Sequence, residues 1–581
     1  MNDYLLAFLA LVPILTVAVF LVGLRWPASR AMPLCYITAA LLALFVWQVS
    51  GIQVAAASLK GLVIATKLLF IVFGAVLLLN TLEQCGAMSQ IRKNFQAISP
   101  DRRIQAIIIG WLFGSFIEGA AGFGTPAALA VPLMVGLGFP PMAAVFVGMV
   151  IQCTPVSFGA AGTPILIGVN NGLSGVGGDA VREYVTGLGY AEGSEGWTSF
   201  LHLIGRRVAT IHVALGSLIP LFLVSLMTKF FGPNKSFREG LSVAPFAIFA
   251  AFAMTIPYLI AATFLGPEFP SLIGGLTGLA IVTFASSKGF LVPKPENAWD
   301  FAPQDQWEPS WTGNMPSAKA EQSANSIGSF TAWSPYLLVA LLLVVTRIYQ
   351  PLKTRVLEAF SFAVPNGFDS AVANTGFFDT SIGEAVQPLY IPGSIFVFVS
   401  FVAFAIFALF HGFTVRGYAQ AWKDSCATMY RASIAMLSAV AMVQVFINSK
   451  GGAAGYQEMP RALAEGVASL LGNSWPALAP FVGGIGAAVA GSNTLSNMMF
   501  SQFQFQVGMD IGADPVWIVA LQAIGGAAGN TICVHNVVAA SAVVGLTGQE
   551  GAVIRKTCFV FLYYAMVPGL FFWLFAHRLL Y

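Results

Sequence analysis

Glu118 is an acid in an otherwise apolar or small stretch, FGSFIEGAAGFGTPAALAVPLMVGLG, at residues 113–138. A carboxyl group in apolar surroundings is expensive to ionise and tends to be protonated. Beside a site for an anion, such an exchangeable proton is what proton coupling needs. We therefore predict that Glu118 couples a proton to transport. A permanently hydrogen-bonded structural acid and a sodium or substrate ligand are the alternatives.

Short hydroxyl and amide side chains accompany glycine-rich breaks at GAAGFGTP (119–126), GAAGTP (159–164), AVAGSNTL (488–495) and GAAGNT (526–531). Helix N-termini at such breaks bind carboxylates through free N–H groups, and freed carbonyls bind small cations. We predict a small organic anion as the ligand. The alternative is that the hydroxyls cap helices and the glycines allow close packing. The predicted substrate-binding residues are Thr125, Thr163, Ser492, Asn493, Thr494, Asn530 and Thr531.

Three further polar residues lie within or beside apolar segments. His535 follows the last break by four residues, where the first half of the chain has Gly168. It is the second candidate for proton coupling, as a relay or a donor to substrate, with a packing histidine as the alternative. Lys67 and Arg431 lie a short way into their apolar runs, and we expect both side chains to snorkel to the membrane interface.

The elements that must position these residues are membrane spans. Of 581 residues, 57% are hydrophobic and only 9% are charged, whereas soluble domains carry about 25% charged residues. Apolar runs such as 4–24, 61–82 and 556–576 are long enough to cross a bilayer core of about 30 Å. The sequence therefore predicts an all-α polytopic membrane protein whose partners include membrane lipid.

The two halves of the chain resemble each other in order and spacing. GAAG at 119–122 precedes GAAG at 159–162, and AVAG at 488–491 precedes GAAG at 526–529. Counting Lys and Arg in the loops places 84–103 in the cytoplasm and 170–205 and both termini outside. The two modules then begin on opposite sides of the membrane. This is the pattern of an inverted-topology repeat, which is typical of secondary transporters.

We divide the chain accordingly into a first repeat, a linking region and a second repeat. Two re-entrant hairpins and two broken helices carry the glycine-rich motifs, because their arms are short and glycine and proline interrupt them. The predicted bounds are 1–232 for the first repeat (hairpin 104–138, broken span 141–169, closing span 206–231), 233–332 for the linking spans and cytoplasmic loop, and 333–581 for the second repeat (hairpin about 476–508, broken span 514–546, closing span 556–577).

Several other functions find no support in the residue pattern. The six cysteines are far apart, without a CxxC or Cys/His cluster that would hold a metal. No phosphate-binding loop, nucleophile elbow or dinucleotide motif occurs in the required context, and no basic tract suits nucleic acid. We expect no enzyme activity, no cofactor, no metal and no nucleic-acid partner.

The glycine-rich motifs also resemble a known family. FGSFIEGAAGFGTPAALAVPLMVGLGFPP with GAAGTP resembles the first-half signature of the lactate permease family of bacterial secondary transporters, and GSNT with GAAGNT resembles its second half. That family is similar to the ion transporter superfamily, in which Ser-Asn-Thr hairpin tips bind the substrate carboxylate and, in sodium-coupled members, help coordinate sodium. Residues Ser492–Thr494 match this Ser-Asn-Thr motif in full. At the first tip only Thr125 matches it, together with backbone groups, so the resemblance gives little support to a sodium site in the first half.

The resemblance implies uptake of L- or D-lactate or glycolate with protons across the bacterial inner membrane. It also implies an elevator-like division into a scaffold and a mobile transport part, with a homodimer as a possible assembly because dimers are common in the superfamily. A sodium-coupled carrier, or a carrier of another small organic anion, is the alternative.

Overall fold

The computed structural model describes residues 2–24, 26–122, 124–174, 178–190, 194–313, 327–352, 362–364, 376–380, 382–389 and 391–576. Within these ranges, eight helices are long and apolar enough to cross a membrane, or up to twelve if each of four bent helix pairs counts as one span. The polytopic helical class predicted from composition is therefore confirmed.

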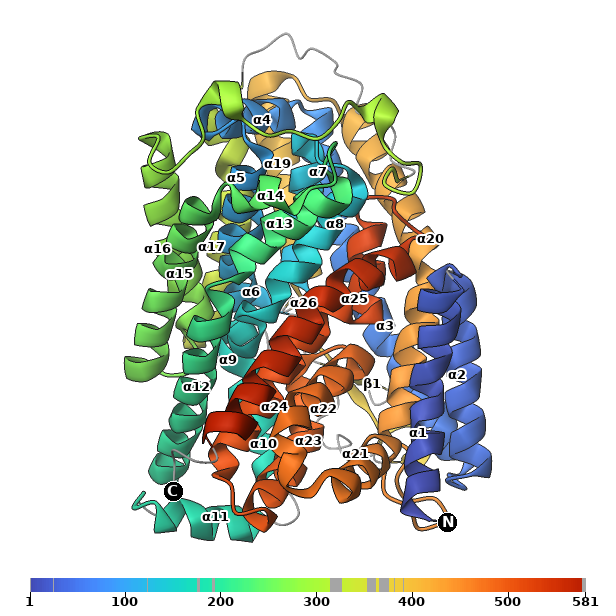
Figure 1. The fold of residues 1–581 in the computed structure, drawn as a ribbon. Helices are drawn as coiled ribbons and strands as arrows, with labels where there is room; N and C mark the ends of the chain where they lie inside the picture. Colours follow the sequence, from blue (N-terminus) through green and yellow to red (C-terminus); the bar gives the residue numbers. More distant parts are fainter. Residues whose placement is uncertain are drawn as a thin grey trace.

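The first part of the chain runs through thirteen α-helices and the middle part through three (Figure 1). They are α1 (Asp3–Val17), α2 (Ala28–Phe45), α3 (Gly51–Gln84), α4 (Ala87–Ile98), α5 (Arg102–Gln105), α6 (Gly114–Ala121), α7 (Thr125–Leu137), α8 (Pro141–Val150), α9 (Gly159–Thr163), α10 (Asn170–Leu173), α11 (Gly178–Gly187), α12 (Ser194–Gly216) and α13 (Ile219–Phe231), followed by α14 (Phe237–Leu241), α15 (Ala244–Phe264) and α16 (Pro270–Ser287).

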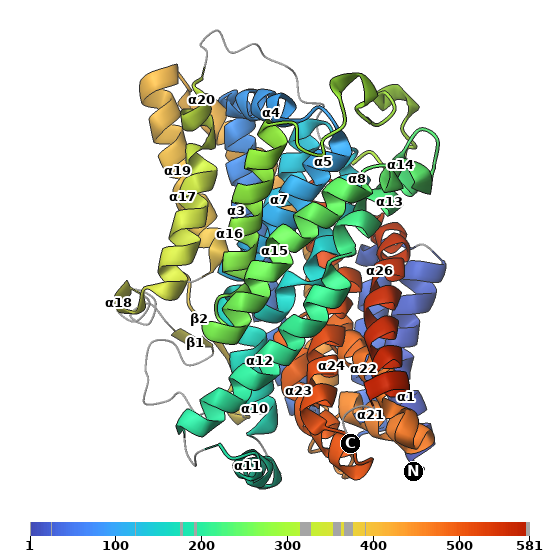
Figure 2. The ribbon, with the colours of Figure 1, turned by 60° about the vertical axis from the view of Figure 1, so that its left-hand side comes forward.

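The last part of the chain is helical apart from one antiparallel ribbon. Its elements are α17 (Ser329–Ile348), α18 (Gln350–Leu352), β1 (Phe362–Val364), β2 (Glu384–Val386), α19 (Pro392–His411), α20 (Val415–Ile447), α21 (Met459–Leu471), α22 (Trp475–Ala490), α23 (Asn493–Asp510), α24 (Pro515–Gly529), α25 (Val534–Ala542) and α26 (Glu550–Phe571). In the ribbon, Ala363 pairs with Ala385, and Figure 2 shows it below α17. The sequence analysis, which expected helices alone, did not predict these strands.

The helices define two ends of the molecule. Figure 1 places α4, α5 and α14 at one end and α11, α21 and the start of α1 at the other. We call these the α4 end and the α11 end. This grouping separates 84–103 from 170–205, as the count of basic residues predicts. Which end faces the cytoplasm remains a prediction.

Hairpin 1 (Arg102–Leu137) enters and returns at the α4 end. Its first arm is helical from α5 through a π-helical segment at Ala106–Phe113 to α6, and α7 is the second arm. Gly122 and Gly124, with φ of +63° and +73°, allow the reversal between the arms. The two outer ends meet where Arg102 Nη1 donates to the Leu137 carbonyl at 2.7 Å.

Hairpin 2 (Trp475–Asp510) has the opposite direction, with its outer ends toward the α11 end (Figure 1). Gly491, at φ +75°, ends α22, and the Ser492 hydroxyl caps α23 by accepting from the Thr494 N–H. Trp475 Nε1 donates to Gln504 Oε1 at 2.7 Å and joins the two arms near their outer ends.

Each hairpin is followed in the chain by a bent helix pair. The pair from Pro141 to Leu173 is bent by 57°, and the pair from Pro515 to Ala542 by 41°. We call the interrupted stretches break 1 (Ile151–Val169, which includes the short helix α9) and break 2 (Asn530–Cys533). Break 1 starts earlier than the predicted Gly159, because 3₁₀ turns already occupy Ile151–Cys153 and Pro155–Phe158.

The sequence Gly-Ala-Ala-Gly occurs in both bent pairs but folds differently in each. At 159–162, Ala160, Ala161 and Gly162 have positive φ of 46°, 54° and 79°. At 526–529 the same residues lie inside the right-handed helix α24. A left-handed alanine costs roughly 1–2 kcal/mol. Contacts with the residues around break 1 must therefore stabilise the left-handed conformation, which the tetrapeptide alone would not adopt.

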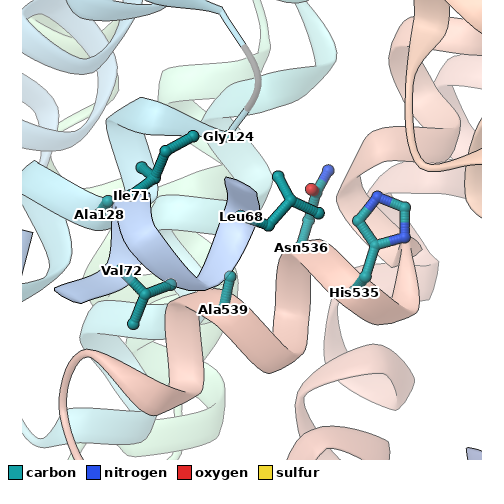
Figure 3. Close-up of a pocket in the computed structure, with 8 residues that line it drawn as sticks. All are labelled: Leu68, Ile71, Val72, Gly124, Ala128, His535, Asn536 and Ala539. Atoms are coloured by element: carbon teal, nitrogen blue, oxygen red, sulfur yellow. The ribbon is translucent and has the colours of Figure 1, made fainter. Parts of the chain in front are cut away.

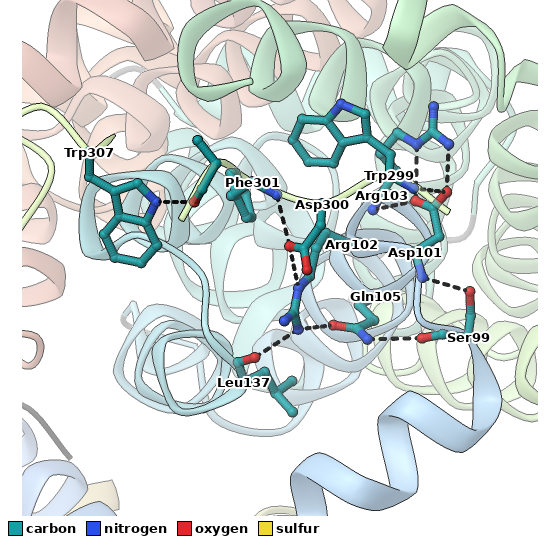
Figure 4. A network of polar contacts seen from close by, with 11 residues as sticks. Ser99, Asp101, Arg102, Arg103, Gln105, Leu137, Trp299, Asp300, Phe301 and Trp307 are labelled. Atoms are coloured by element: carbon teal, nitrogen blue, oxygen red, sulfur yellow. Dashed lines mark hydrogen bonds and ion pairs between the residues drawn. The ribbon is translucent and has the colours of Figure 1, made fainter. Parts of the chain in front are cut away.

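A loop at 294–313, which we call the strap, crosses the base of hairpin 1 at the α4 end (Figure 4). The Trp299 N–H donates to Asp101 Oδ2 at 3.1 Å and the Trp299 carbonyl accepts from the Arg102 N–H at 3.0 Å. Arg102 Nε also pairs with Asp300 at 2.9 Å. Further along, the Trp311 carbonyl accepts from the Met142 N–H at the start of α8. The strap thus holds hairpin 1 and α8 together.

Candidate functional site

The two hairpin tips meet the two bent helix pairs inside the helix bundle. A Cβ built on Gly122 would lie 2.8 Å from Ala160 Cβ, and one on Gly491 would lie 1.2 Å from the ring of His535. The tip of hairpin 1 therefore packs against break 1, and the tip of hairpin 2 packs against the start of α25, directly after break 2. Contacts also cross between the halves, since a Cβ on Gly124 would lie 3.3 Å from Asn536 Oδ1 and Ser157 Oγ donates to the Ala523 carbonyl at 3.4 Å.

Glu118 lies at this convergence on α6, one turn before the tip of hairpin 1. The residue is 2% exposed. Its Oε2 has no hydrogen-bond partner among the described residues. Its Oε1 lies against break 1, because a Cβ on Gly159 would be 2.6 Å from that oxygen. An acid in such surroundings can carry a proton at low cost, as the coupling prediction requires.

Asn493 takes the corresponding place in the second half. It is the first residue of α23 and is 1% exposed. Neither Oδ1 nor Nδ2 is bonded within the described part of the chain. A Cβ on Gly526, the counterpart of Gly159 in the repeated tetrapeptide, would lie 2.0 Å from Asn493 Oδ1. Each half therefore directs one polar side chain from its hairpin onto the first glycine of GAAG.

The other predicted binding residues fall into two groups. Thr125 Oγ1 and Asn530 Oδ1 are buried without a hydrogen-bond partner in the ranges that the structure describes, so they remain available to a ligand. The remaining hydroxyls bond their own backbone: Thr163 to the Gly159 carbonyl at 3.2 Å and Thr531 to the Ala528 carbonyl at 2.7 Å. Ser492 Oγ accepts from the Thr494 N–H at 3.2 Å. The Ser492 bond caps α23, which is the alternative role that the sequence left open for a hydroxyl, and Thr494 is half-buried beside Ser492.

His535 is the second residue of α25, the helix that follows break 2. Its Nε2 lies 3.1 Å from the Gly491 carbonyl, which can only accept, so Nε2 carries a hydrogen. His535 also lines a small pocket between α3, α25 and the tip of hairpin 1 (Figure 3). The pocket-lining residues are Leu68, Ile71, Val72, Gly124, Ala128, His535, Asn536 and Ala539. This pocket combines an apolar wall with two polar side chains from α25.

Lys67 precedes the pocket-lining Leu68 on α3. It pairs with Glu384 on β2, 317 residues away. Both side chains of this pair are partly exposed, at 25% for Lys67 and 20% for Glu384, and the snorkelling of Lys67 stays a prediction. The side chain of Arg431 lies outside the described residues.

The sequence analysis missed polar residues that the fold brings to the same region. Asn536 Nδ2 lies 3.5 Å from Gln152 Oε1 and links α25 to break 1. Gln522 Nε2 donates to Ser496 Oγ at 3.0 Å and links α24 to α23. Gln152 and Gln522 precede the two GAAG tetrapeptides by seven and four residues, and the sequence comparison of the two halves pairs them without giving either a role.

A model of the L-lactate permease family matches residues 6–579. The chain belongs to the L-lactate permease family. Among its relatives are a putative L-lactate permease of Haemophilus influenzae, 30% identical over 86% of this chain and 85% of the relative, and the L-lactate permease of Bacillus subtilis, 28% identical over 84% and 81%. The glycolate permease GlcA of Escherichia coli is 27% identical over 97% of this chain and 94% of its own length.

Membership in a permease family, together with the candidate spans, identifies this chain as a multi-pass membrane transporter and not an enzyme. The family recognised from the glycine-rich motifs is confirmed.

Proposed function

We propose that this permease takes up small 2-hydroxymonocarboxylates, such as L- or D-lactate or glycolate, by proton symport across the inner membrane of a bacterium. The similarity to L-lactate and glycolate permeases supports the substrate class. The observation that carries the proposal further is that the tip of hairpin 1 packs against break 1 and the tip of hairpin 2 against His535 at the start of α25. Buried polar atoms without a partner among the described residues lie at the two tips (Thr125 and Asn493), one turn before the first tip (Glu118) and in break 2 (Asn530).

In this proposal the substrate carboxylate binds where helices begin. α7 and α23 start at the two tips, with Thr125 and Asn493 as their first residues. Free N–H groups and the positive end of a helix dipole stabilise an anion there. The site would comprise Thr125, Asn493 and Asn530, with backbone groups near Thr163, Ser492, Thr494 and Thr531. Glu118 and His535 would exchange the coupling proton.

The proposal includes alternating access by an inverted repeat. The opposite directions of hairpins 1 and 2 in Figure 1 support two re-entrant hairpins that enter from opposite sides of the membrane. We assign the hairpins and bent helix pairs to a mobile transport part and the long helices around them to a scaffold. The division into repeats at 1–232 and 333–581, with 233–332 between them, belongs to this proposal, as does a homodimer.

Uptake by the purified protein in liposomes tests the function. Labelled L-lactate, D-lactate and glycolate are offered under an inward proton gradient, in sodium and in sodium-free potassium buffer, with a protonophore as the control. We expect accumulation that needs the proton gradient and is indifferent to sodium. Accumulation driven only by a sodium gradient would establish the sodium-coupled alternative. No saturable uptake of any of the three acids would refute the proposed function.

A further inference from the structure

Asn497 lies on α23 one turn after Asn493 and is fully buried. Its Nδ2 donates to the Pro164 carbonyl in break 1 at 3.1 Å. A carbonyl can only accept, so this bond fixes which way the Asn497 amide is turned. The other amide atom, Oδ1, is therefore an acceptor, and no described residue donates to it.

The Asn497 oxygen points to the same place as the Asn493 amide. A Cβ built on Gly526 would lie 2.0 Å from Asn493 Oδ1 and 3.7 Å from Asn497 Oδ1. Glycine at 526 leaves room for the Asn493 amide, which a larger residue would displace. Two buried amides from successive turns of one helix thus converge on α24, one turn before break 2.

The two amides differ in the hydrogen-bond partners that they need. Asn497 Oδ1 needs a donor, and an ionised carboxylate has none. Asn493 keeps both a donor and an acceptor free of described partners, so its Nδ2 can donate to a carboxylate. In a 2-hydroxy acid, the hydroxyl is the group that supplies a donor next to the carboxylate.

We propose that Asn497 determines specificity by accepting a hydrogen bond from the 2-hydroxyl of the substrate, while Asn493 donates to its carboxylate. This inference rests on the proposed function. It explains how the carrier distinguishes a 2-hydroxy acid from a keto acid or an unsubstituted acid of nearly the same size. An acid without the hydroxyl leaves the Asn497 oxygen buried and unbonded, which is costly.

Competition for labelled L-lactate uptake tests the inference first on the unmodified protein. Lactate is compared with pyruvate, 2-fluoropropionate and propionate, which have a similar size but no donor at carbon 2. We expect each of the three to compete at least about tenfold more weakly than lactate, as expected for the loss of a hydrogen bond at a buried group. Pyruvate competing as well as lactate would overturn the inference.

Asn497→Ala tests the residue itself, with Ser501→Ala as the matched control. Ser501 lies one turn further along α23 and is equally buried, but the atoms nearest to a Cβ on Gly526 belong to Asn493 and Asn497 and not to Ser501. We expect Asn497→Ala to lower the lactate-to-propionate ratio by about tenfold or more, and Ser501→Ala to leave the ratio unchanged. The ratio is insensitive to how much protein reaches the membrane.

An unchanged lactate-to-propionate ratio in Asn497→Ala, even with slower uptake of both acids, would show that Asn497 does not recognise the hydroxyl. The proposed transport of lactate would stand in that case. The analogue series on the unmodified protein decides the question if the variant does not fold. Failure of the unmodified protein to transport any 2-hydroxy acid would refute the proposed function and this inference with it.

Discussion

Gly159 lies directly against the carboxylate of Glu118: a Cβ at position 159 would be 2.6 Å from Oε1 and 3.4 Å from the Glu118 carbonyl. The backbone of Gly159, at φ −66° and ψ 155°, is one that alanine adopts freely. An added methyl group therefore acts on the position of the acid rather than on the conformation of the chain.

Gly159→Ala should displace the Glu118 side chain while the protein still reaches the membrane. We expect proton-driven lactate accumulation to fall several-fold, because the acid no longer rests in its place at break 1. Uptake in liposomes at matched protein amounts measures the effect. Gly187→Ala is the control, since no described atom lies within 4 Å of a Cβ there. Normal accumulation by Gly159→Ala would show that the position of Glu118 is irrelevant to transport.

Glu118→Gln should separate coupling from binding. Glutamine keeps the shape of a neutral acid but has no exchangeable acidic proton. We expect accumulation against a gradient to fail and counterflow of labelled against unlabelled lactate to persist, because exchange needs no net proton movement. Glu195→Gln, on an exposed part of α12, provides the control. Accumulation at the unmodified level would exclude Glu118 as the coupling residue and direct attention to His535.

Asn493→Ala should weaken substrate binding strongly. A lost hydrogen bond to a charged group costs roughly 1.5–3 kcal/mol, or about ten- to more than a hundredfold in affinity. Equilibrium binding of labelled lactate to the purified protein measures this without relying on expression. Gln506→Ala, on the exposed side of the same helix, should bind normally. Equal affinity in the two variants would remove Asn493 from the site.

Labelling of single cysteines tests which end of the molecule faces outward. Gln96 lies on α4 and Tyr190 follows α11, at opposite ends of the fold. In a background without the exposed Cys426, an impermeant reagent added to intact cells should label a cysteine at 190 and not one at 96. The opposite pattern would reverse the orientation of both hairpins.

Asp101→Asn should destabilise the base of hairpin 1. Asp101 and Arg103 form an ion pair whose side chains are 0% and 5% exposed, and removing one buried charge leaves the other uncompensated at about 3–5 kcal/mol. Asp300→Asn removes a partner of Arg102 that is 58% exposed, where about 0–1 kcal/mol is expected. Thermal unfolding of the two purified variants should therefore differ clearly, and equal midpoints would contradict the buried pair's role.

The sequence predicted those parts of the fold whose cause is local. The tip of hairpin 1 lies where glycines permit positive φ, and the bends lie near the predicted motifs. The first arm begins at Arg102 rather than 104 because the Asp101 side chain caps it. An aspartate before a helix is a recognisable N-cap, which the sequence analysis did not use. The left-handed GAAG in break 1 was not predictable, because the identical tetrapeptide is helical in α24. Its conformation depends on contacts with distant residues.

In the candidate site, too, only the residues next to local motifs were predictable. Glycine motifs identified the tips and breaks, and thereby Glu118 and Asn493. Asn497 could not be recognised, because its significance depends on the Pro164 carbonyl, 333 residues away. The partner of Lys67 was hidden for the same reason.

The strap has a consequence for dividing the chain into fragments. Its hydrogen bonds reach Asp101, Arg102 and Met142, all N-terminal to the strap. A gene split after Gly313 therefore keeps these bonds within one polypeptide, and the two products need only recognise each other through their helices. A split before Lys294 places the strap on the C-terminal fragment. The base of hairpin 1, on the N-terminal fragment, is then synthesised without the strap that bonds to it. These bonds join the strap to the helices that precede it in the chain.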